Sequence, residues 1–590
     1  MIDDLFNHLN KQQKEAVAYV DGPSVILAGA GSGKTRVLVY KVLNLIKNHS
    51  VPARSIVMIT FTNKAANEMK QRIKIKNIGF VGTFHSFCVS ILRREADNIG
   101  IDHNFVIYDE HDQINLMKSV LKKLETKKFT PNYFLNRISA AKNQLITAEK
   151  YLEFFSDHNA SLVADVYQNY ETTLKKNNAL DFDDLIMKTV ELLIKNESVL
   201  EKYQDKYPFL LVDEFQDTNY AQYSLTRLLG EKSRKVTVVG DFSQSIYSWR
   251  GADIRNLEKF KEDFPETKIF NLECNYRSTQ KILNFAYEVI SKNQTHPILN
   301  LFTDNELGED VTFYEADNEE DEAIYVANVI EGLKRNLPYA SFAVLYRTNA
   351  QSRIFEESFL RYGIPYLLIG GTRFYERKEI KDVLSYLRLF VNPQDEIAKE
   401  RIKKLGKKRW HDFQDFYSKI LPKVNELTTV DLMDKIFQET KYLDIYNPDE
   451  EEDYSRIENI KELKSVALSF PRLTEFLEQV ALVESEYFEG EKRNKNYDGV
   501  RLMTLHQAKG LEFPVVFIVG LEEGILPHSK SIDDYFQLEE ERRLFYVGIT
   551  RAQKKLYITS AKRRFIFGHR GEAVKSRFIR DENDLEINYY

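Results

Sequence analysis

The stretch SVILAGAGSGKT, which spans Ser24–Thr35, decides the expected fold. Its first part, Ser24–Ala28, has the composition of a short buried strand, and a glycine-rich loop ending in Gly-Lys-Thr follows. Glycines let a backbone fold around a phosphate chain where side chains would clash, and the loop amides then point at negative charge. A strand followed by such a loop predicts a phosphate-binding loop in an α/β protein with a parallel sheet.

The chemistry of this loop predicts ATP and Mg²⁺ as cofactors. Lys34 can reach the β and γ phosphates of a nucleotide, and Thr35 can ligate Mg²⁺. Ala28 stands where the general pattern has its first glycine. The residues expected to hold the nucleotide here are Ala28, Gly29, Ala30, Gly31, Ser32, Gly33, Lys34, Thr35 and Arg36.

Two acidic residues, Asp213 and Glu214, directly follow the apolar run Phe209–Val212. A carboxylate at the end of a buried strand can bind Mg²⁺, and a second one beside it can polarise an attacking water. A solvated acidic turn is the alternative. The upstream phosphate-binding loop favours the catalytic interpretation, with Asp213 as the metal ligand and Glu214 as the base.

Composition limits the classes of protein that remain. A chain of 590 residues is expected to form about two to four domains. It contains no apolar run of about 18 residues, so we expect no membrane span. The two cysteines, Cys88 and Cys274, are too few for a disulfide framework or a cysteine metal cluster. The N-terminus lacks the features of a secretory signal, and a reduced, cytoplasmic protein is expected.

The net charge of −6 argues mildly against a passive nucleic-acid binder. Basic residues nevertheless gather at Lys403–Arg409 and Lys562–Arg564. A nucleic-acid site needs only local positive potential, so the global charge does not exclude one.

Strand-like runs alternate with helical segments in two parts of the chain, which indicates parallel α/β sheets. The expected strands are Ser24–Ala28, Ser55–Thr60, Phe209–Val212, Lys235–Val239, Val311–Tyr314, Phe342–Tyr346, Gly499–Thr504 and Val515–Val519. Each part is interrupted by a long helix-rich stretch, so the predicted fold is two α/β domains that each contain a mainly helical insertion.

Five further motifs follow in a fixed order. They are TFTNKAA (Thr60–Ala66), GDFSQSIYSWRGA (Gly240–Ala252), NYRS (Asn275–Ser278), TLHQAKGLEF (Thr504–Phe513) and YVGITRA (Tyr546–Ala552). Phosphoryl transfer requires positive charge on the γ phosphate, and Arg277 and Arg551 could supply it. A lone arginine is more often a surface residue. We expect both arginines to come from a second domain and to couple hydrolysis to domain closure.

With these motifs assembled, the chain resembles the UvrD/Rep/PcrA family of superfamily 1 DNA helicases, over roughly Leu9 to Phe578. The resemblance implies two RecA-like domains and ATP-driven 3′-to-5′ movement on single-stranded DNA. In this family the loop AGAGSGKT is the usual wording. By the same resemblance, Gln13 contacts the adenine edge, Tyr276 stacks on the adenine, and Glu512 contacts the nucleotide. Gln244 then links the γ phosphate to the DNA site, and Arg277 and Arg551 contact that phosphate.

Aromatic and polar residues of the same motifs are expected to bind the DNA strand, because aromatic faces stack on any base. The residues expected to contact DNA are Phe61, Asn63, His85, Tyr247, Trp249, Arg250, Arg353, Thr504, His506 and His528. An aromatic is more often part of a core, and a lone histidine is often a satisfied structural group. For Trp249 its position beside Gln244 favours stacking, whereas for His85 and His528 both interpretations stay open.

The resemblance also sets the expected domain boundaries. Residues 1–107 and 186–282 form the first RecA-like domain, 108–185 its helical insertion, 283–390 and 497–580 the second domain, 391–496 a shortened insertion, and 581–590 a C-terminal tail. The stretch RIKKLGKKRW (Arg401–Trp410) is either a remnant of a duplex-binding turn or a solvated basic helix.

Three functions are compatible with these residues. The first is a 3′-to-5′ DNA helicase that acts on single strands and single-strand/duplex junctions, with repair or replication proteins as candidate partners. The second is a translocase that displaces bound proteins and unwinds poorly alone, which the shortened insertion would favour. The third is a non-motor kinase with a phosphate-binding loop, which has no need of Gln244, Trp249 and Arg551. RNA is not excluded, because stacking does not sense the 2′-hydroxyl.

Overall fold

The structure is a computed structural model that describes residues 6–126, 129–480, 498–566 and 569–579. The chain divides into two compact units. Unit 1 contains residues 1–277 and 290–306, and unit 2 contains residues 278–289 and 307–590. The chain therefore passes between the units three times, whereas one passage near residue 282 was expected.

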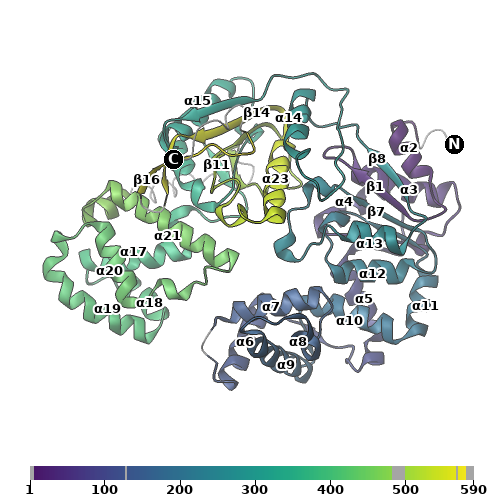
Figure 1. The fold of residues 1–590 in the computed structure, drawn as a ribbon, viewed down its shortest axis with the longest axis horizontal. Coiled ribbons are helices and arrows are strands. Elements are labelled where there is room, and N and C mark those ends of the chain that lie inside the picture. Colours follow the sequence, from purple (N-terminus) through teal and green to yellow (C-terminus); the bar gives the residue numbers. More distant parts are fainter. Residues whose placement is uncertain (1–5, 127–128, 481–497, 567–568, 580–590) are drawn as a thin grey trace. The chain divides into compact units, whose positions relative to one another are not determined.

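Unit 1 is built on a six-stranded parallel sheet of order β3-β2-β6-β7-β1-β8. Its strands are β1 (Ser24–Ala28), β2 (Ile56–Thr60), β3 (Phe80–Thr83), β6 (Phe209–Val212), β7 (Val236–Gly240) and β8 (Lys268–Leu272). The strand that leads into the phosphate-binding loop, β1, lies between β7 and β8, and β6 lies on the other side of β7 (Figure 1).

Helices cover both faces of this sheet, so successive residues of one strand enter different cores. Ile26 packs with α2 (Lys11–Ala18), α3 (Lys34–Lys47) and α4 (Asn63–Ile73). Val25 and Leu27 pack on the opposite face. The helices of that face are α5 (Phe84–Glu95), α10 (Phe182–Lys195), α11 (Glu197–Lys206), α12 (Tyr220–Gly230) and α13 (Asn256–Asp263). This three-layer arrangement buries each strand on both sides, which explains the continuous apolar runs.

The first insertion has its own core between residues 116 and 179. Its helices are α6 (Glu110–Lys123), α7 (Pro131–Asn143), α8 (Tyr151–Phe154) and α9 (Ala160–Lys176). The chain enters through β4 (Val106–Ile107) and leaves through β5 (Ala179–Leu180), which pair in parallel. Since Leu185 already packs in the core of the sheet, the insertion ends before the expected residue 185.

Unit 2 contains a second six-stranded parallel sheet, of order β11-β12-β10-β13-β14-β9. Its strands are β9 (Thr312–Ala316), β10 (Phe342–Tyr346), β11 (Tyr366–Leu368), β12 (Val500–Thr504), β13 (Phe513–Ile518) and β14 (Ala552–Ala561). The helices α14 (Gln280–Ile290), α15 (Glu319–Leu333), α16 (Ser352–Arg361) and α23 (Tyr535–Ile549) accompany it, and β15 (Arg563–Ile566) pairs with β16 (His569–Glu572). The fold is thus α/β with two RecA-like sheets, as predicted.

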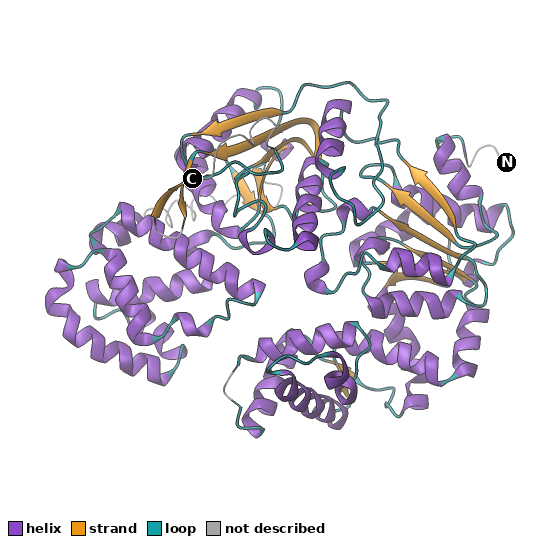
Figure 2. Ribbon diagram, in the orientation of Figure 1, coloured by secondary structure: helices purple, strands orange, loops and turns teal. Residues whose placement is uncertain are grey.

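The second insertion starts earlier than predicted. Its core begins at Phe374 and includes α17 (Lys378–Val391), so the expected start at residue 391 is too late. The other helices are α18 (Glu396–Lys404), α19 (Lys407–Ile420), α20 (Thr429–Thr440) and α21 (Glu451–Ser469). Both insertions consist almost wholly of helix (Figure 2). The predicted end at residue 496 and the tail 581–590 lie outside the described residues.

Candidate nucleotide site and nucleic-acid interface

The phosphate-binding loop joins β1 to α3, and two of its glycines have left-handed backbone conformations. The φ angle is +66° at Gly31 and +85° at Gly33, where side chains are strained. A Cβ on Gly29 would lie 2.3 Å from Leu301 Cδ2, and one on Gly31 would lie 2.7 Å from Asn275 Nδ2. Lys34 begins α3, whose N-terminal amides favour negative charge. The loop therefore has the geometry that phosphate binding requires.

The residues that follow β8 hold this loop from the side. Asn275 Nδ2 donates a hydrogen bond to the carbonyl oxygen of Ala30 over 2.6 Å, and the Tyr276 amide donates to that of Gly31 over 3.0 Å. Arg277 is the next residue and belongs to unit 1, like the loop itself. The expectation that both arginines come from a second domain is therefore wrong for Arg277, because β8 delivers it beside β1.

Gln13 and Tyr276 both adjoin the loop. Gln13 is completely buried, and its Nε2 donates to the carbonyl oxygen of Ser32 over 2.8 Å. Asn10 caps α2 and donates to the Tyr276 hydroxyl over 2.8 Å, while the Tyr276 ring stays 45% exposed. Arg36 is exposed in the first turn of α3. An amide nitrogen has a second hydrogen, so recognition of adenine by Gln13 remains a prediction.

The buried carboxyl group of Asp213 stands at the end of β6. Its Oδ1 atom has no hydrogen-bond partner among the described residues. Burial, reinforced by the charge of Glu214, raises the pKa of Asp213 to about 7. A nearby cation would offset that cost by favouring the charged carboxylate. The site therefore fits a divalent cation, and Thr35, in the first turn of α3, has a hydroxyl suited to the same ion.

Glu214 is oriented by a residue that the sequence did not single out. Its backbone is left-handed, with φ of +51°. Gln216, which is fully buried, donates from Nε2 to Glu214 Oε2 over 2.7 Å. The other end of the same amide, Oε1, accepts a hydrogen bond from the Asp241 amide over 3.0 Å. Gln216 therefore ties the acidic pair to the end of β7, where Gln244 Nε2 donates to Asp241 Oδ2 over 2.5 Å.

An exposed group of aromatic and basic side chains follows β7, and we call Tyr247, Trp249 and Arg250 the strand surface. Trp249 is 52% exposed, and the Arg250 guanidinium lies 4.5 Å from its ring centroid. The rings of Tyr247 and Trp249 are 6.4 Å apart. A large, solvent-facing indole beside a guanidinium is unusual for a core residue and suits base stacking.

The neighbouring candidates of unit 1 differ in exposure. Asn63 is exposed at the start of α4, whereas Phe61 is partly buried with its ring 6.2 Å from that of Phe84. The His85 ring lies 5.8 Å from that of Phe182, and burial lowers the pKa of His85. Phe182 is 48% exposed, although it is a large apolar residue. The sequence analysis missed it; a phenylalanine at the first position of a helix was the available signal.

Arg551 and Glu512 share one corner of unit 2. Arg551 is only 2% exposed and follows α23. Its guanidinium and Nε donate to the carbonyl oxygens of Leu511 and Val547 over 3.2 and 2.9 Å. Glu512 Oε1 accepts a hydrogen bond from Gln553 over 3.0 Å. Contact of Arg551 with a phosphate would require this side chain to leave its carbonyl partners, so its role stays a prediction.

The DNA candidates of unit 2 are largely engaged within the protein. Arg353 is 8% exposed and lies 2.9 Å from Glu357 and 2.6 Å from Glu462 of α21. His528 is 7% exposed, and its Nε2 lies 3.6 Å from Glu458 of α21. These two side chains therefore anchor the second insertion in this structure. The remaining two candidates, a buried Thr504 and a half-buried His506, follow one another closely at the end of β12.

The basic stretch Arg401–Trp410 forms the end of α18, a turn at Gly406 with φ of +131°, and the start of α19. Arg401 pairs with Asp382 over 2.5 Å, and Lys403 pairs with Glu400 over 2.9 Å. Lys404, Lys407 and Lys408 are exposed. Both interpretations of this stretch, a duplex contact and a solvated basic surface, are compatible with this arrangement.

Comparison with known proteins gives the class. The UvrD/REP helicase N-terminal domain model matches residues 9–265, and the UvrD-like helicase C-terminal domain model matches residues 270–448 and 402–563. The chain therefore belongs to the UvrD/Rep helicase family and is a DNA helicase that uses ATP. Among the described residues, no helix is both long enough and apolar enough to cross a bilayer.

Individual relatives make the match more specific. The chain is 42% identical to the ATP-dependent DNA helicase PcrA of Bacillus subtilis over 641 aligned positions, which cover 99% of this chain and 86% of the relative. It is also 42% identical to the PcrA proteins of Staphylococcus epidermidis and Staphylococcus aureus, with 98% of this chain and 86% of each relative covered.

Proposed function

We propose that this helicase moves 3′-to-5′ along single-stranded DNA and unwinds duplexes from single-strand/duplex junctions. The observation that carries the proposal is the strand surface, which follows β7 directly, while the fully buried Gln216 ties the end of β7 to Glu214. One short stretch of chain therefore serves both the base-stacking surface and the hydrolytic site.

In the proposed site, Lys34 and the loop amides bind the ATP phosphates, and Glu214 polarises the attacking water. Gln13, Arg36 and Tyr276 surround the adenine. Gln244 senses the γ phosphate, and Glu512 contributes from unit 2. Arg277 and Arg551 neutralise charge that develops on the γ phosphate, as guanidinium groups do in phosphoryl transfer.

Mg²⁺ is the proposed metal, held by Thr35 and Asp213. When bound, it would neutralise charge on the phosphate oxygens. The carboxyl of Asp213 supports this assignment, because a buried carboxylate oxygen without a hydrogen-bond partner is costly unless a cation accompanies it.

For DNA we propose contacts from the strand surface, Phe61, Asn63, His85 and the additional Phe182. Arg353, Thr504, His506 and His528 remain proposed contacts of unit 2, and for Arg353 and His528 they require release from α21. Junction DNA, repair or replication-restart proteins as partners, and a cytoplasmic location complete the proposal. Two buried free cysteines support a reducing compartment.

The test is strand separation with ATP and Mg²⁺ on two duplexes that carry either a 3′ or a 5′ single-stranded tail. Separation of the 3′-tailed duplex alone is expected, and separation of the 5′-tailed duplex alone would overturn the direction. If neither duplex is separated while a protein bound to single-stranded DNA is displaced, the translocase function is the correct one.

A further inference from the structure

The last two residues of α7 connect the first insertion to the ATPase core of unit 1. The side chain of Lys142 is fully buried, and its Nζ lies 2.8 Å from both Asp181 Oδ2 and Asp184 Oδ1 at the start of α10. It also lies 2.6 Å from Glu171 Oε1 of α9. Burial opposes the charge, but the three carboxylates outweigh it and raise the pKa of Lys142 well above its ordinary value. A charged lysine therefore fixes the end of α7.

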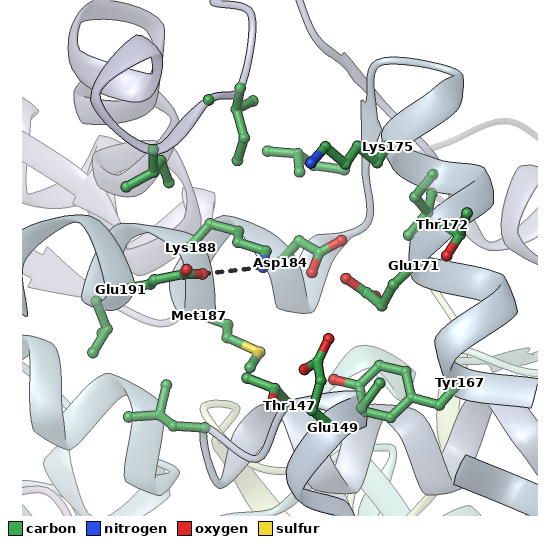
Figure 3. A pocket seen from close by; sticks show the side chains of 18 of the residues that line it. Thr147, Glu149, Tyr167, Glu171, Thr172, Lys175, Asp184, Met187, Lys188 and Glu191 are labelled. Carbon is green, nitrogen blue, oxygen red and sulfur yellow. Dashed lines mark hydrogen bonds and ion pairs between the residues drawn. The ribbon is translucent and has the colours of Figure 1, made fainter. Parts of the chain in front are cut away.

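A cavity of about 970 Å³ lies beside this ion cluster, between α9 and α10. The carboxylates of Asp184, Glu171 and Glu149 and the hydroxyl of Tyr167 point into it (Figure 3). Side-chain packing does not fill the space between the two helices here. The ion cluster around Lys142 therefore contributes strongly to the attachment of the insertion, and α7 is held at its end.

The next residue, Asn143, contacts the loop that carries the acidic pair. Asn219 Nδ2 donates a hydrogen bond to Asn143 Oδ1 over 2.7 Å. Asn219 also caps α12, because its Oδ1 accepts from the Gln222 amide over 2.9 Å. In the sequence, Asn219 directly follows DEFQDT, so its position fixes the exit of the loop that begins at Asp213.

Asn143 also touches the turn that ends the strand surface. A Cβ built on Gly251 would lie 3.6 Å from both Cβ and Nδ2 of Asn143, which is ordinary van der Waals contact. Gly251 directly follows Arg250. Two residues later, the Asp253 amide donates to the carbonyl oxygen of Thr218 over 3.0 Å. Asn143 thus lies where the acidic loop and the strand surface meet.

We propose that Asn143 is a positioning residue that couples binding of single-stranded DNA at the strand surface to ATP hydrolysis at the acidic pair. A strand that stacks on Trp249 changes the turn at Gly251, which contacts Asn143. Because the ion cluster holds the end of α7, Asn143 passes this change to Asn219 instead of moving away. The inference rests on the roles proposed for Glu214 and Trp249.

The hydrogen bond between two asparagines allows a charge-reversal-free test with three variants. Asn143→Asp keeps an acceptor for the Asn219 amide. Asn219→Asp keeps the cap of α12, and the Asn143 amide can rotate to donate to it. Only the double variant places two carboxylates against each other. Asn177→Asp, at an exposed site of the same insertion, is the matched control.

The readout is the factor by which saturating oligo-dT stimulates kcat of ATP hydrolysis, with KM for ATP and Tm measured alongside. Each single variant and the control should keep that factor within about twofold of the original chain, while the double variant should lose about three- to tenfold. The KM for ATP and the affinity for oligo-dT should change little in all of them.

An unchanged stimulation factor in the double variant would overturn the inference. A fall of kcat by the same factor with and without DNA would also overturn it, because that result means damage to the acidic loop rather than lost coupling. Trp249→Ala separates this failure from failure of the proposed function. If Trp249→Ala binds oligo-dT normally, the strand surface itself is wrong; if it loses binding while the double variant is still stimulated, only the coupling role is wrong.

Discussion

Gln216 Nε2 donates a 2.7 Å hydrogen bond to Glu214 Oε2, so a buried amide two positions along the chain orients the proposed base. The left-handed backbone of Glu214 turns its side chain away from the direction that a continuing strand would impose. Because the amide oxygen of Gln216 is also occupied, by the Asp241 amide, the side chain is held at both ends. The base is thereby positioned before any substrate binds.

Substitution of this amide should slow hydrolysis without weakening binding. In Gln216→Leu, the apolar side chain removes both hydrogen bonds, and we expect kcat to fall about tenfold. KM for ATP and the Kd for oligo-dT should stay near their original values, since no proposed binding residue is altered. Steady-state ATPase assays check this, with the exposed Gln168→Leu as the control. A rise in KM at constant kcat would contradict the positioning role.

The proposed base itself is tested by Glu214→Gln. This variant should bind ATP and oligo-dT as the original chain does, because Lys34, Thr35 and Asp213 remain in place. Turnover should fall by about two to four orders of magnitude, the usual contribution of a general base. Filter binding of nucleotide and a phosphate-release assay measure the two quantities. Hydrolysis near the original rate would assign the base to another residue.

Removal of an aromatic face should weaken strand binding. We expect Trp249→Ala and Phe182→Ala each to lose about 1–3 kcal/mol of affinity for oligo-dT, the usual contribution of one stacked base. Fluorescence anisotropy with a labelled oligonucleotide measures this change. Phe154→Ala removes a ring that is 63% exposed on α8 and should leave affinity unaltered. Equal affinity for all three variants would exclude both rings from the DNA site.

A buried lysine predicts a pH dependence of stability. Lys41 is 3% exposed, and burial lowers its pKa from 10.5 to about 7. Between these two values the unfolded chain binds more protons than the folded one. The free energy of unfolding should therefore rise with pH in this window, by up to about 1.4 kcal/mol per pH unit.

Urea unfolding of the original chain and of Lys41→Met at several pH values between 7 and 10 isolates this contribution, since other groups titrate alike in both proteins. The stability of the original chain relative to the variant should increase with pH. Lys41 Nζ also donates to the carbonyl oxygens of Ala16 and Tyr19, over 3.0 and 2.6 Å. If these bonds kept the amine charged, the two curves would instead run parallel.

Strand prediction succeeded where burial is complete on both faces. The runs Ser24–Ala28, Phe209–Val212 and Phe342–Tyr346 match β1, β6 and β10 residue for residue, because these strands lie inside their sheets. The strands β3, β8 and β11 escaped prediction, and all three are edge strands. An edge strand is covered on fewer sides: in β8, three of five residues are exposed, which breaks the apolar run. The inner strand β14 was missed because two lysines interrupt it.

The sequence alone determined the phosphate-binding loop, the acidic pair and the family, because each depends on residues that are adjacent in the chain. Tertiary structure decided which unit carries Arg277, where the second insertion begins, and that Arg353 and His528 pair with α21. It also revealed Gln216 and Asn143 as links between motifs. The partner of a polar side chain is set by which segments the sheets bring together, as when Asn143 meets Asn219 across 76 positions, and no local pattern encodes that meeting.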